Sequence, residues 1–96
     1  MVYLQASIKL RPGTLPQFTT LLNELLPLVG KHGMKLLGSY ASVIGRVNTV
    51  VDLWELPDAS ALQAVQSDPA LQKVGPRIAE IIEDETVTLL TKLPIG

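Results

Sequence analysis

The chain has no cysteine among its 96 residues and only one histidine, His32. Without thiols it can form neither a disulfide nor a thiolate nucleophile, which leaves its redox compartment open. A single histidine without cysteine or a paired acidic cluster is a poor set of metal ligands, so we expect no metal. The glycines form no phosphate-binding pattern, and no cofactor is predicted.

The sequence also lacks an excess of charge of one sign. Eight Lys and Arg against nine Asp and Glu leave a net charge of −1, and these charges are scattered. No basic run is present to neutralise phosphates or an anionic membrane surface, so neither nucleic acid nor membrane is an expected partner. Apolar runs are too short to cross a bilayer, and no signal-like segment precedes the first predicted strand. A cytoplasmic protein is the default expectation.

Aromatic residues are scarce at 4%, whereas hydrophobic residues make up 47% of the chain, so its apolar content is mostly aliphatic. A chain this short has room for one domain, which we place at residues 1–96. It also buries a smaller fraction of its surface than a larger protein does. Self-association would bury more of this apolar surface, and we expect a homodimer.

Alternation and helical spacing predict the secondary structure. We predict strands at residues 2–10, 35–43, 47–56 and 85–93. A first helix starts after a capping box of Thr14 and Gln17, and a second helical region is split into segments at about 58–66 and 68–82. The pair Gly45-Arg46 predicts a two-residue hairpin turn between the middle strands. The order β-α-β-β-α-β is typical of an α+β, ferredoxin-like fold with a four-stranded antiparallel sheet and helices on one face.

The strand at residues 47–56 is the centre of this arrangement. Successive side chains of a strand point to opposite faces, so it presents two rows, and both are largely apolar. One row contains Asn48, Val50, Asp52, Trp54 and Leu56, and the other contains Thr49, Val51, Leu53 and Glu55. The neighbouring strand is expected to add Leu37, Ala41 and Val43 to the second row. Because helices cover only one face, we expect a second copy to pack sheet to sheet as a dimeric α/β barrel, with a higher oligomer left open.

Several stretches resemble the NIPSNAP family, a branch of the dimeric α/β-barrel superfamily. They are M-V-Y-L-Q-A-S-I-K-L-R-P-G, K-H-G-M-K-L-L-G-S-Y, I-G-R-V-N-T-V-V-D-L-W and S-D-P-A, whose order and spacing match over the whole length. The resemblance implies the fold and a pocket more firmly than a reaction. Related barrels include cofactor-free monooxygenases, muconolactone isomerases and polyketide cyclases. The family often has a histidine where Asp52 stands and polar residues where Leu4 and Ala6 stand, so any family chemistry that uses that histidine is absent here.

Asp52 is the first candidate catalytic residue, because it is an acid inside an otherwise apolar strand. In a pocket between sheet and helices it would be a partly desolvated carboxylate with a raised pKa that takes or orients a proton on a small, mostly apolar ligand. The alternative, which we favour, is structural. In that case Asp52 is hydrogen-bonded to a neighbouring strand or paired with Arg46, Lys9 or Arg77, as buried acids commonly are.

Four other residues complete the candidate site. His32 is a candidate general base near the pocket mouth, although a cation at a helix end is the simpler role. Trp54 lies on the same strand as Asp52, and we expect Tyr40 near them on the paired strand. Both aromatic residues could bind a planar ligand or serve as core or interface anchors. Asn48 could present its amide to a ligand or stabilise its turn.

Two functions are compatible with the sequence. The first is a small protein that binds a hydrophobic or aromatic molecule between sheet and helices, as a cofactor-independent isomerase, cyclase or monooxygenase. The second is a non-catalytic stress or interaction protein whose functional unit is the dimer. A cavity that opens onto Asp52 and Trp54 would favour the first, and a filled space between sheet and helices would favour the second.

Overall fold

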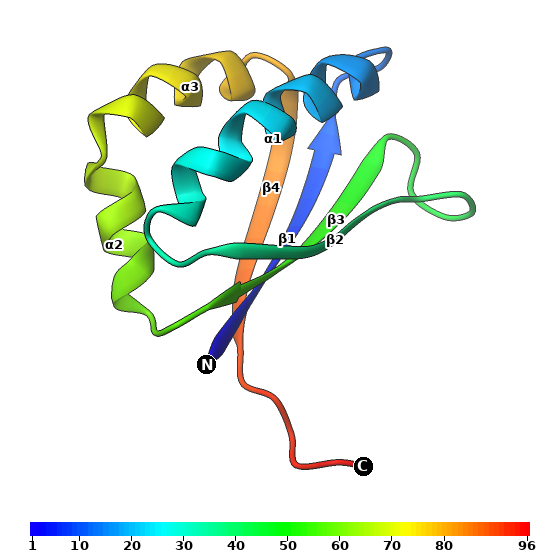
Figure 1. Ribbon diagram of the computed structural model, residues 1–96. Coiled ribbons are helices and arrows are strands. Elements are labelled where there is room, and N and C mark those ends of the chain that lie inside the picture. The colour runs from blue at the N-terminus through cyan, green and yellow to red at the C-terminus, as the bar shows by residue number, and fades with distance from the viewer.

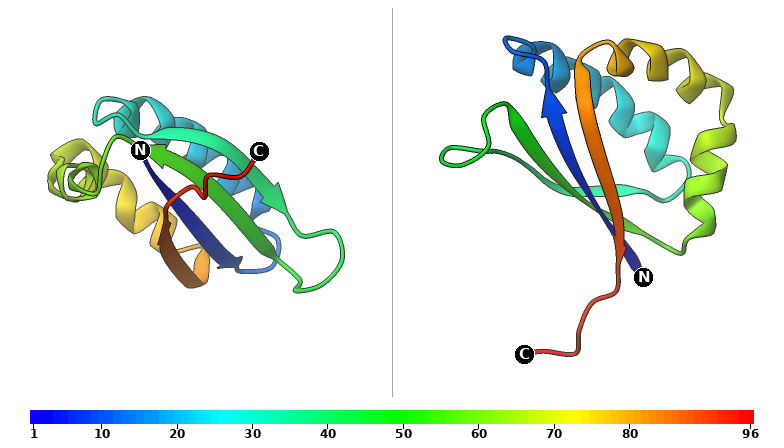
Figure 2. Two further views of the ribbon diagram at one scale, coloured as in Figure 1. Left: turned by 90° about the horizontal axis from the view of Figure 1, so that it is seen from below. Right: turned by 180° about the vertical axis from the view of Figure 1, so that it is seen from behind.

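Four strands form one antiparallel sheet in the order β2-β3-β1-β4, and three helices cover one of its faces (Figure 1). The computed structural model describes residues 1–96. The elements in chain order are β1 (Val2–Leu10), α1 (Leu15–Gly30), β2 (Lys35–Ala41), β3 (Thr49–Leu56), α2 (Ser60–Ser67), α3 (Pro69–Ala79) and β4 (Ile82–Leu90). This confirms the predicted α+β, ferredoxin-like arrangement with a split second helical region. The left view of Figure 2 looks onto the uncovered face of the sheet, with the helices behind it.

The hydrophobic core lies between the sheet and the helices. Strands β1 and β3 alternate, and their helix-facing side chains are buried except for Val2 at the start of β1, which is half-buried. The buried side chains are Leu4, Ala6, Ile8 and Leu10 from β1 and Val50, Asp52, Trp54 and Leu56 from β3. Helix α1 adds buried Phe18, Leu21 and Val29, whose spacing places them along one side of the helix. The predicted division of β3 into two faces is therefore confirmed.

Helices α2 and α3 meet at Asp68. Its extended backbone ends α2, and its carboxylate accepts a hydrogen bond of 2.9 Å from the backbone N–H of Ala70 in the first turn of α3. Pro69 follows at the first helical position, where its missing N–H leaves no bond unmade. The predicted capping box of α1 is not formed, because the hydroxyl of Thr14 donates instead to the carbonyl of Arg11.

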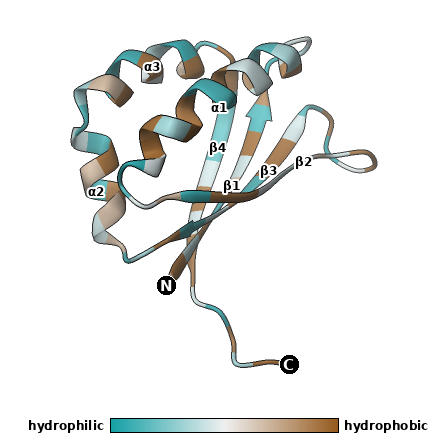
Figure 3. Ribbon diagram, viewed as in Figure 1, coloured by the Kyte–Doolittle hydropathy of each residue, from teal (hydrophilic) through white to brown (hydrophobic).

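The connection between β2 and β3 is longer than predicted. The strands stop at Ala41 and Thr49, so a loop over residues 42–48 replaces the expected two-residue turn. Gly45 and Asn48 both have positive φ, of 115° and 57°. Asparagine tolerates this conformation better than most residues, and Asn48 therefore serves the loop. Val43 and Ile44 on this loop are 95% exposed, and Figure 3 shows hydrophobic colouring there.

The last helix and the last strand are also shifted from their predicted bounds. Helix α3 ends at Ala79 and not near residue 82, and β4 covers residues 82–90 and not 85–93. The reason is pairing with β1, because Ile82 already lies opposite Leu10 and the N–H of Arg11 donates to the carbonyl of Ile81. The register of this ladder shifts between Lys9 and Leu10, because Lys9 pairs with Asp84 whereas Leu10 pairs with Ile82.

A β-bulge at Leu37 decides which way the rest of β2 faces. Leu36 pairs with Trp54, but the next pair is Gly38 with Leu53, so Leu37 is an extra residue. One extra residue moves each later side chain of the strand to the opposite face of the sheet. Tyr40 consequently lies opposite Val51 on the uncovered face, and the expected position of Tyr40 next to Asp52 is wrong. Ser39 takes that position instead.

The uncovered face of the sheet is partly apolar. The side chains of Tyr3, Val51 and Leu53 are half-buried there, and Leu37, Tyr40 and Leu90 are exposed. Two expected members of this face are placed elsewhere, because Ala41 pairs with Val50 on the helix side and Val43 belongs to the loop. None of the three helices combines the length and the apolar character needed to cross a bilayer.

Candidate functional site

A cavity of about 290 Å³ lies between the helix layer and the sheet. Fifteen of its eighteen lining residues are hydrophobic, and they come from β1, β3, β4, all three helices and Met34 in the α1–β2 connection. The three remaining lining residues are Asp52, Gln66 and Glu85. Such a cavity, apolar with few polar groups, is the usual form of a small-molecule site. The space that leads to Asp52 and Trp54 is therefore not filled, which is the arrangement expected for the first of the two functions compared above.

The cavity opens along β4. Val87 and Leu89 lie on the helix side of the sheet, opposite Ala6 and Leu4, yet they are 50% and 46% exposed. Their partners on β1 are only 5% and 6% exposed. The helices therefore cover β1 and leave this part of the edge strand uncovered, so a molecule can enter over β4.

Asp52 lies at the closed end of the cavity and is 2% exposed. Ser39, across the β2–β3 ladder, donates a hydrogen bond from its hydroxyl to Oδ1 of Asp52. The other oxygen of the carboxylate, Oδ2, has no hydrogen-bond partner in the chain. All fully buried side-chain nitrogen and oxygen atoms have a partner, so Oδ2 is not fully buried and is accessible from the cavity. Burial raises the pKa of the Asp52 carboxyl, and the bond from Ser39 opposes this rise only in part.

None of the basic residues considered as partners forms an ion pair with Asp52. Lys9 lies 3.7 Å from Glu83, and Arg77 lies 2.8 Å from Glu24. Arg46 belongs to the loop over residues 42–48. The predicted ion pair is therefore absent, whereas the predicted hydrogen bond to a neighbouring strand is present through Ser39. Asp52 is a buried acid without a compensating cation, which is the exception among buried acids.

Glu85 is a second acid of the cavity, and it is not among the site residues predicted from the sequence. It lies on β4 opposite Ile8, on the helix side of the sheet, and its side chain is exposed at the open edge. Although Glu85 is exposed, partial burial of its carboxyl by the cavity wall raises the pKa of this group, and the negative charge of Asp52 raises it further. A signal was available in the sequence, because Glu85 alternates with Val87 and Leu89 in the predicted strand at residues 85–93 and so shares a face with them.

The other predicted site residues are placed as follows. Trp54 is 5% exposed and forms part of the cavity wall. Tyr40 is 63% exposed on the opposite face, and Asn48 lies in the loop outside the cavity. The structure thus brings together Asp52 and Trp54 but separates both from Tyr40 and Asn48.

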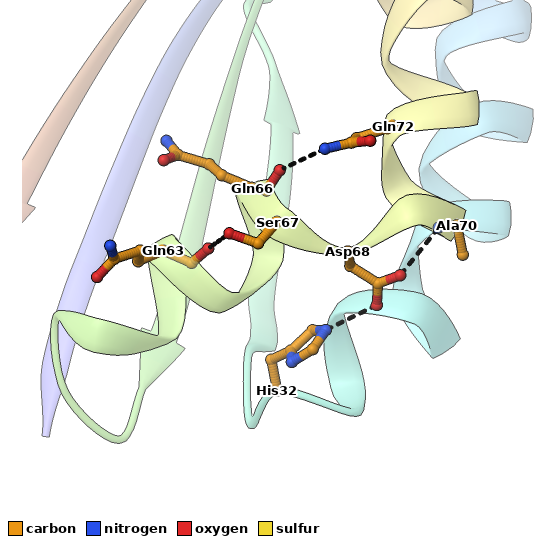
Figure 4. Close-up of polar contacts among 7 residues, drawn as sticks. All are labelled: His32, Gln63, Gln66, Ser67, Asp68, Ala70 and Gln72. Carbon is orange, nitrogen blue, oxygen red and sulfur yellow. Dashed lines mark hydrogen bonds and ion pairs between the residues drawn. The ribbon is translucent and has the colours of Figure 1, made fainter.

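His32 is also outside the cavity. Its Nε2 lies 2.8 Å from Oδ2 of Asp68, and Figure 4 shows its ring pointing toward the junction of α2 and α3. The hydrogen bond from His32 is the largest cause of a lowered pKa at Asp68, and the N–H of Ala70 adds to it. This pair connects the end of α1 to the start of α3, which is a structural arrangement and not the expected position at the pocket mouth.

Neither metal ligands nor a cationic anchor are gathered at this site. No group of three or more His, Asp or Glu side chains is close enough together to hold a metal ion. The cavity lining contains no Lys, Arg or His. Its chemistry therefore rests on two carboxyl groups with raised pKa values, one amide and a large apolar wall.

Known proteins place this fold in context. A crystal structure of an uncharacterized NIPSNAP domain protein from Burkholderia xenovorans has a TM-score of 0.84 at 23% identity, over 100% of this chain and 98% of that chain. A NIPSNAP family protein of unknown function from Agrobacterium tumefaciens gives 0.81 at 22% identity, over 94% and 86%. An antibiotic biosynthesis monooxygenase gives 0.74 at 22% identity, over 98% and 100%. No curated protein matches the chain.

At such identities these likenesses concern the fold. The sequence itself carries the family relationship, because the sequence model of the NIPSNAP family matches residues 3–95, nearly the whole chain. The resemblance found in the sequence is thereby confirmed, and the chain belongs to the NIPSNAP family.

Proposed function

We propose that this protein binds a small hydrophobic molecule in the cavity over β4 and that Asp52 exchanges a proton with it. The observation that supports this most is the position of Asp52: it is almost fully buried and has one oxygen open to an apolar cavity. A carboxyl group whose pKa is raised toward the working pH is suited to general acid–base catalysis.

The chemistry that fits this site needs no cofactor. An apolar cavity excludes water, and a carboxylate that has lost its hydration removes a proton from a weakly acidic C–H or O–H more readily than an exposed one does. Proton abstraction next to a carbonyl begins isomerisations, cyclisations and some oxygenations without a cofactor. The fold likeness to an antibiotic biosynthesis monooxygenase is compatible with the last of these.

The proposal is tested by proton exchange on a bound probe. Tetralone, an apolar ketone with acidic C–H groups, is incubated with the protein in D2O, and loss of its C–H signals is followed by NMR. We expect the protein to accelerate exchange and Asp52→Asn to abolish this acceleration. Asp84→Asn makes the same change on the opposite face of the sheet and should exchange as the wild type does. Exchange that survives Asp52→Asn, or no acceleration by the wild type, would refute the role of Asp52.

We also propose that the uncovered face of the sheet packs against a second copy of the chain. The support is its apolar content, together with a shallow hollow of about 470 Å³ lined in part by Tyr3, Leu37, Leu53 and Leu90. Sedimentation equilibrium should show a dimer that Tyr40→Glu converts to a folded monomer. Leu15→Glu, an equivalent change at an exposed residue of α1, should stay dimeric. A monomeric wild type would contradict this proposal.

A further inference from the structure

The charges around the cavity are unbalanced, and this imbalance points to a class of ligand. Both ionisable groups that line the cavity, Asp52 and Glu85, are acids, and no basic side chain lines it. Asp52 is nine-tenths buried or more and directs an unpartnered oxygen into the cavity. The remaining lining from β1, α1, α2 and α3 is apolar except for Gln66, so no other titratable group faces the two acids.

The two acids occupy different depths. Asp52 lies on β3 opposite Ala6, and Glu85 lies on β4 opposite Ile8, so β1 separates the two acids and they are offset along it. At the usual strand dimensions their backbones are about 12 Å apart. Asp52 is buried at the closed end, whereas Glu85 is exposed where the cavity opens. A molecule in the cavity would therefore meet Glu85 with its outer end and Asp52 with its inner part.

We propose that the ligand is an apolar molecule carrying a protonated amine, with the ammonium group held by Glu85 at the mouth and the apolar body reaching Asp52 and Trp54. This inference rests on the proposed binding role of the cavity. A cation beside Glu85 would offset the repulsion between the two carboxylates, which the chain itself leaves uncompensated. A carboxylate ligand would add a third negative charge to a site without any cation, so the cavity should reject it.

The division of roles is compatible with proton exchange at Asp52. The ammonium group lies at the solvated mouth, so it leaves the buried carboxyl unpaired and able to act on the apolar body. Acidification weakens the contact at the mouth, because protonation of Glu85 removes the charge that holds the amine. Since the pKa of Glu85 is raised, this loss begins at a higher pH than for an ordinary glutamate.

The experiment compares three molecules that differ only in the end group: adamantylmethylamine, adamantylmethanol and adamantanecarboxylate. All three are transparent where tryptophan absorbs, and Trp54, the single tryptophan of the chain, lines the cavity and reports binding by its fluorescence. We expect the amine to bind more tightly than the alcohol, and the carboxylate to bind most weakly. Glu85→Gln should weaken the amine by about fivefold, as for a partly exposed ion pair, and leave the alcohol unchanged.

Glu83→Gln is the matched control, because Glu83 lies two residues away on the same strand, contacts Lys9 and does not line the cavity. It should leave the affinity for the amine unchanged. Equal binding of amine and alcohol, tightest binding of the carboxylate, or a Glu85→Gln variant with unchanged amine affinity would overturn this inference. In each of these cases the cavity still binds an apolar molecule, so the proposed function survives. If none of the three binds, both proposals fail.

Discussion

Ser39→Ala is the most direct test of the environment of Asp52. Ser39 donates the single hydrogen bond that the Asp52 side chain receives, and Asp52 is 2% exposed. A hydrogen bond to a charged acceptor contributes about 1.5–3 kcal/mol to stability, and one to a neutral acceptor contributes about 1 kcal/mol. We therefore expect a loss of about 1.5–3 kcal/mol where Asp52 is ionised and of about 1 kcal/mol where it is protonated.

The sign of the pH dependence follows from the direction of the pKa shift. Burial raises the pKa of folded Asp52 above its unfolded value, so folding favours the protonated carboxyl. This contribution to stability is fully present below the unfolded pKa and is lost as the pH rises through the folded pKa. The bond from Ser39 lowers the folded pKa, and its removal raises this pKa further. The difference in unfolding free energy between wild type and Ser39→Ala should therefore grow as the pH rises.

Urea unfolding at a series of pH values from acidic to mildly alkaline measures this difference, because the charge of Asp52 changes as the pH passes its raised pKa. Ser42→Ala is the control, since its hydroxyl donates to the exposed carbonyl of Ile44 and touches no carboxylate. An NMR titration of the Asp52 side-chain carbon gives its pKa independently. A loss for Ser39→Ala that stays constant with pH, or an Asp52 pKa that falls in this variant, would refute the reasoning.

Three further predictions concern stability. Gly33→Ala should cost about 1–2 kcal/mol in urea unfolding, because φ at Gly33 is 83° and the new Cβ would lie 2.7 Å from Pro57. Gly30→Ala is its control: the new Cβ would meet no neighbouring atom, so this change should be neutral or stabilising by up to about 1 kcal/mol. Leu56→Ala should cost about 2–5 kcal/mol, because this residue is fully buried. Asp68→Asn should lower the melting temperature at neutral pH, because the lowered pKa of Asp68 means that its ionised form stabilises the fold. This contribution disappears as the pH falls through the folded pKa of Asp68, so in acid the variant and the wild type should melt at similar temperatures.

The regular part of the fold could be predicted from the sequence because its signal is local. The strict alternation of β1 and β3 shows which side chains share a face, and the structure places Asp52 and Trp54 together on the helix side as expected. The split of the second helical region was also visible, since Asp68-Pro69 is a helix start with a capping acid and a proline.

Strand β2 could not be predicted in the same way, because a single extra residue reverses the faces of all that follow it. The alternation of residues 35–43 gives no unique position for a bulge, and a regular strand would have placed Tyr40 beside Asp52. The adjacent Leu36 and Leu37 followed by Gly38 are compatible with a bulge, since glycine within a strand often marks one. Only pairing with β3 decides between the two faces, and it selects Ser39 as the partner of Asp52.

The mouth of the cavity depends on the positions of elements that are far apart in the sequence. Figure 1 shows that α3 meets β4 only near the start of the strand and runs across its direction and not along it. Beyond Asp68, α2 turns away from α3 and lies to the side of β4 (Figure 1). The helix-facing residues toward the end of β4, Val87 and Leu89, are therefore left uncovered. The opening beside Glu85 thus depends on where α2 and α3 lie relative to β4, which the alternation of residues within the strand does not determine.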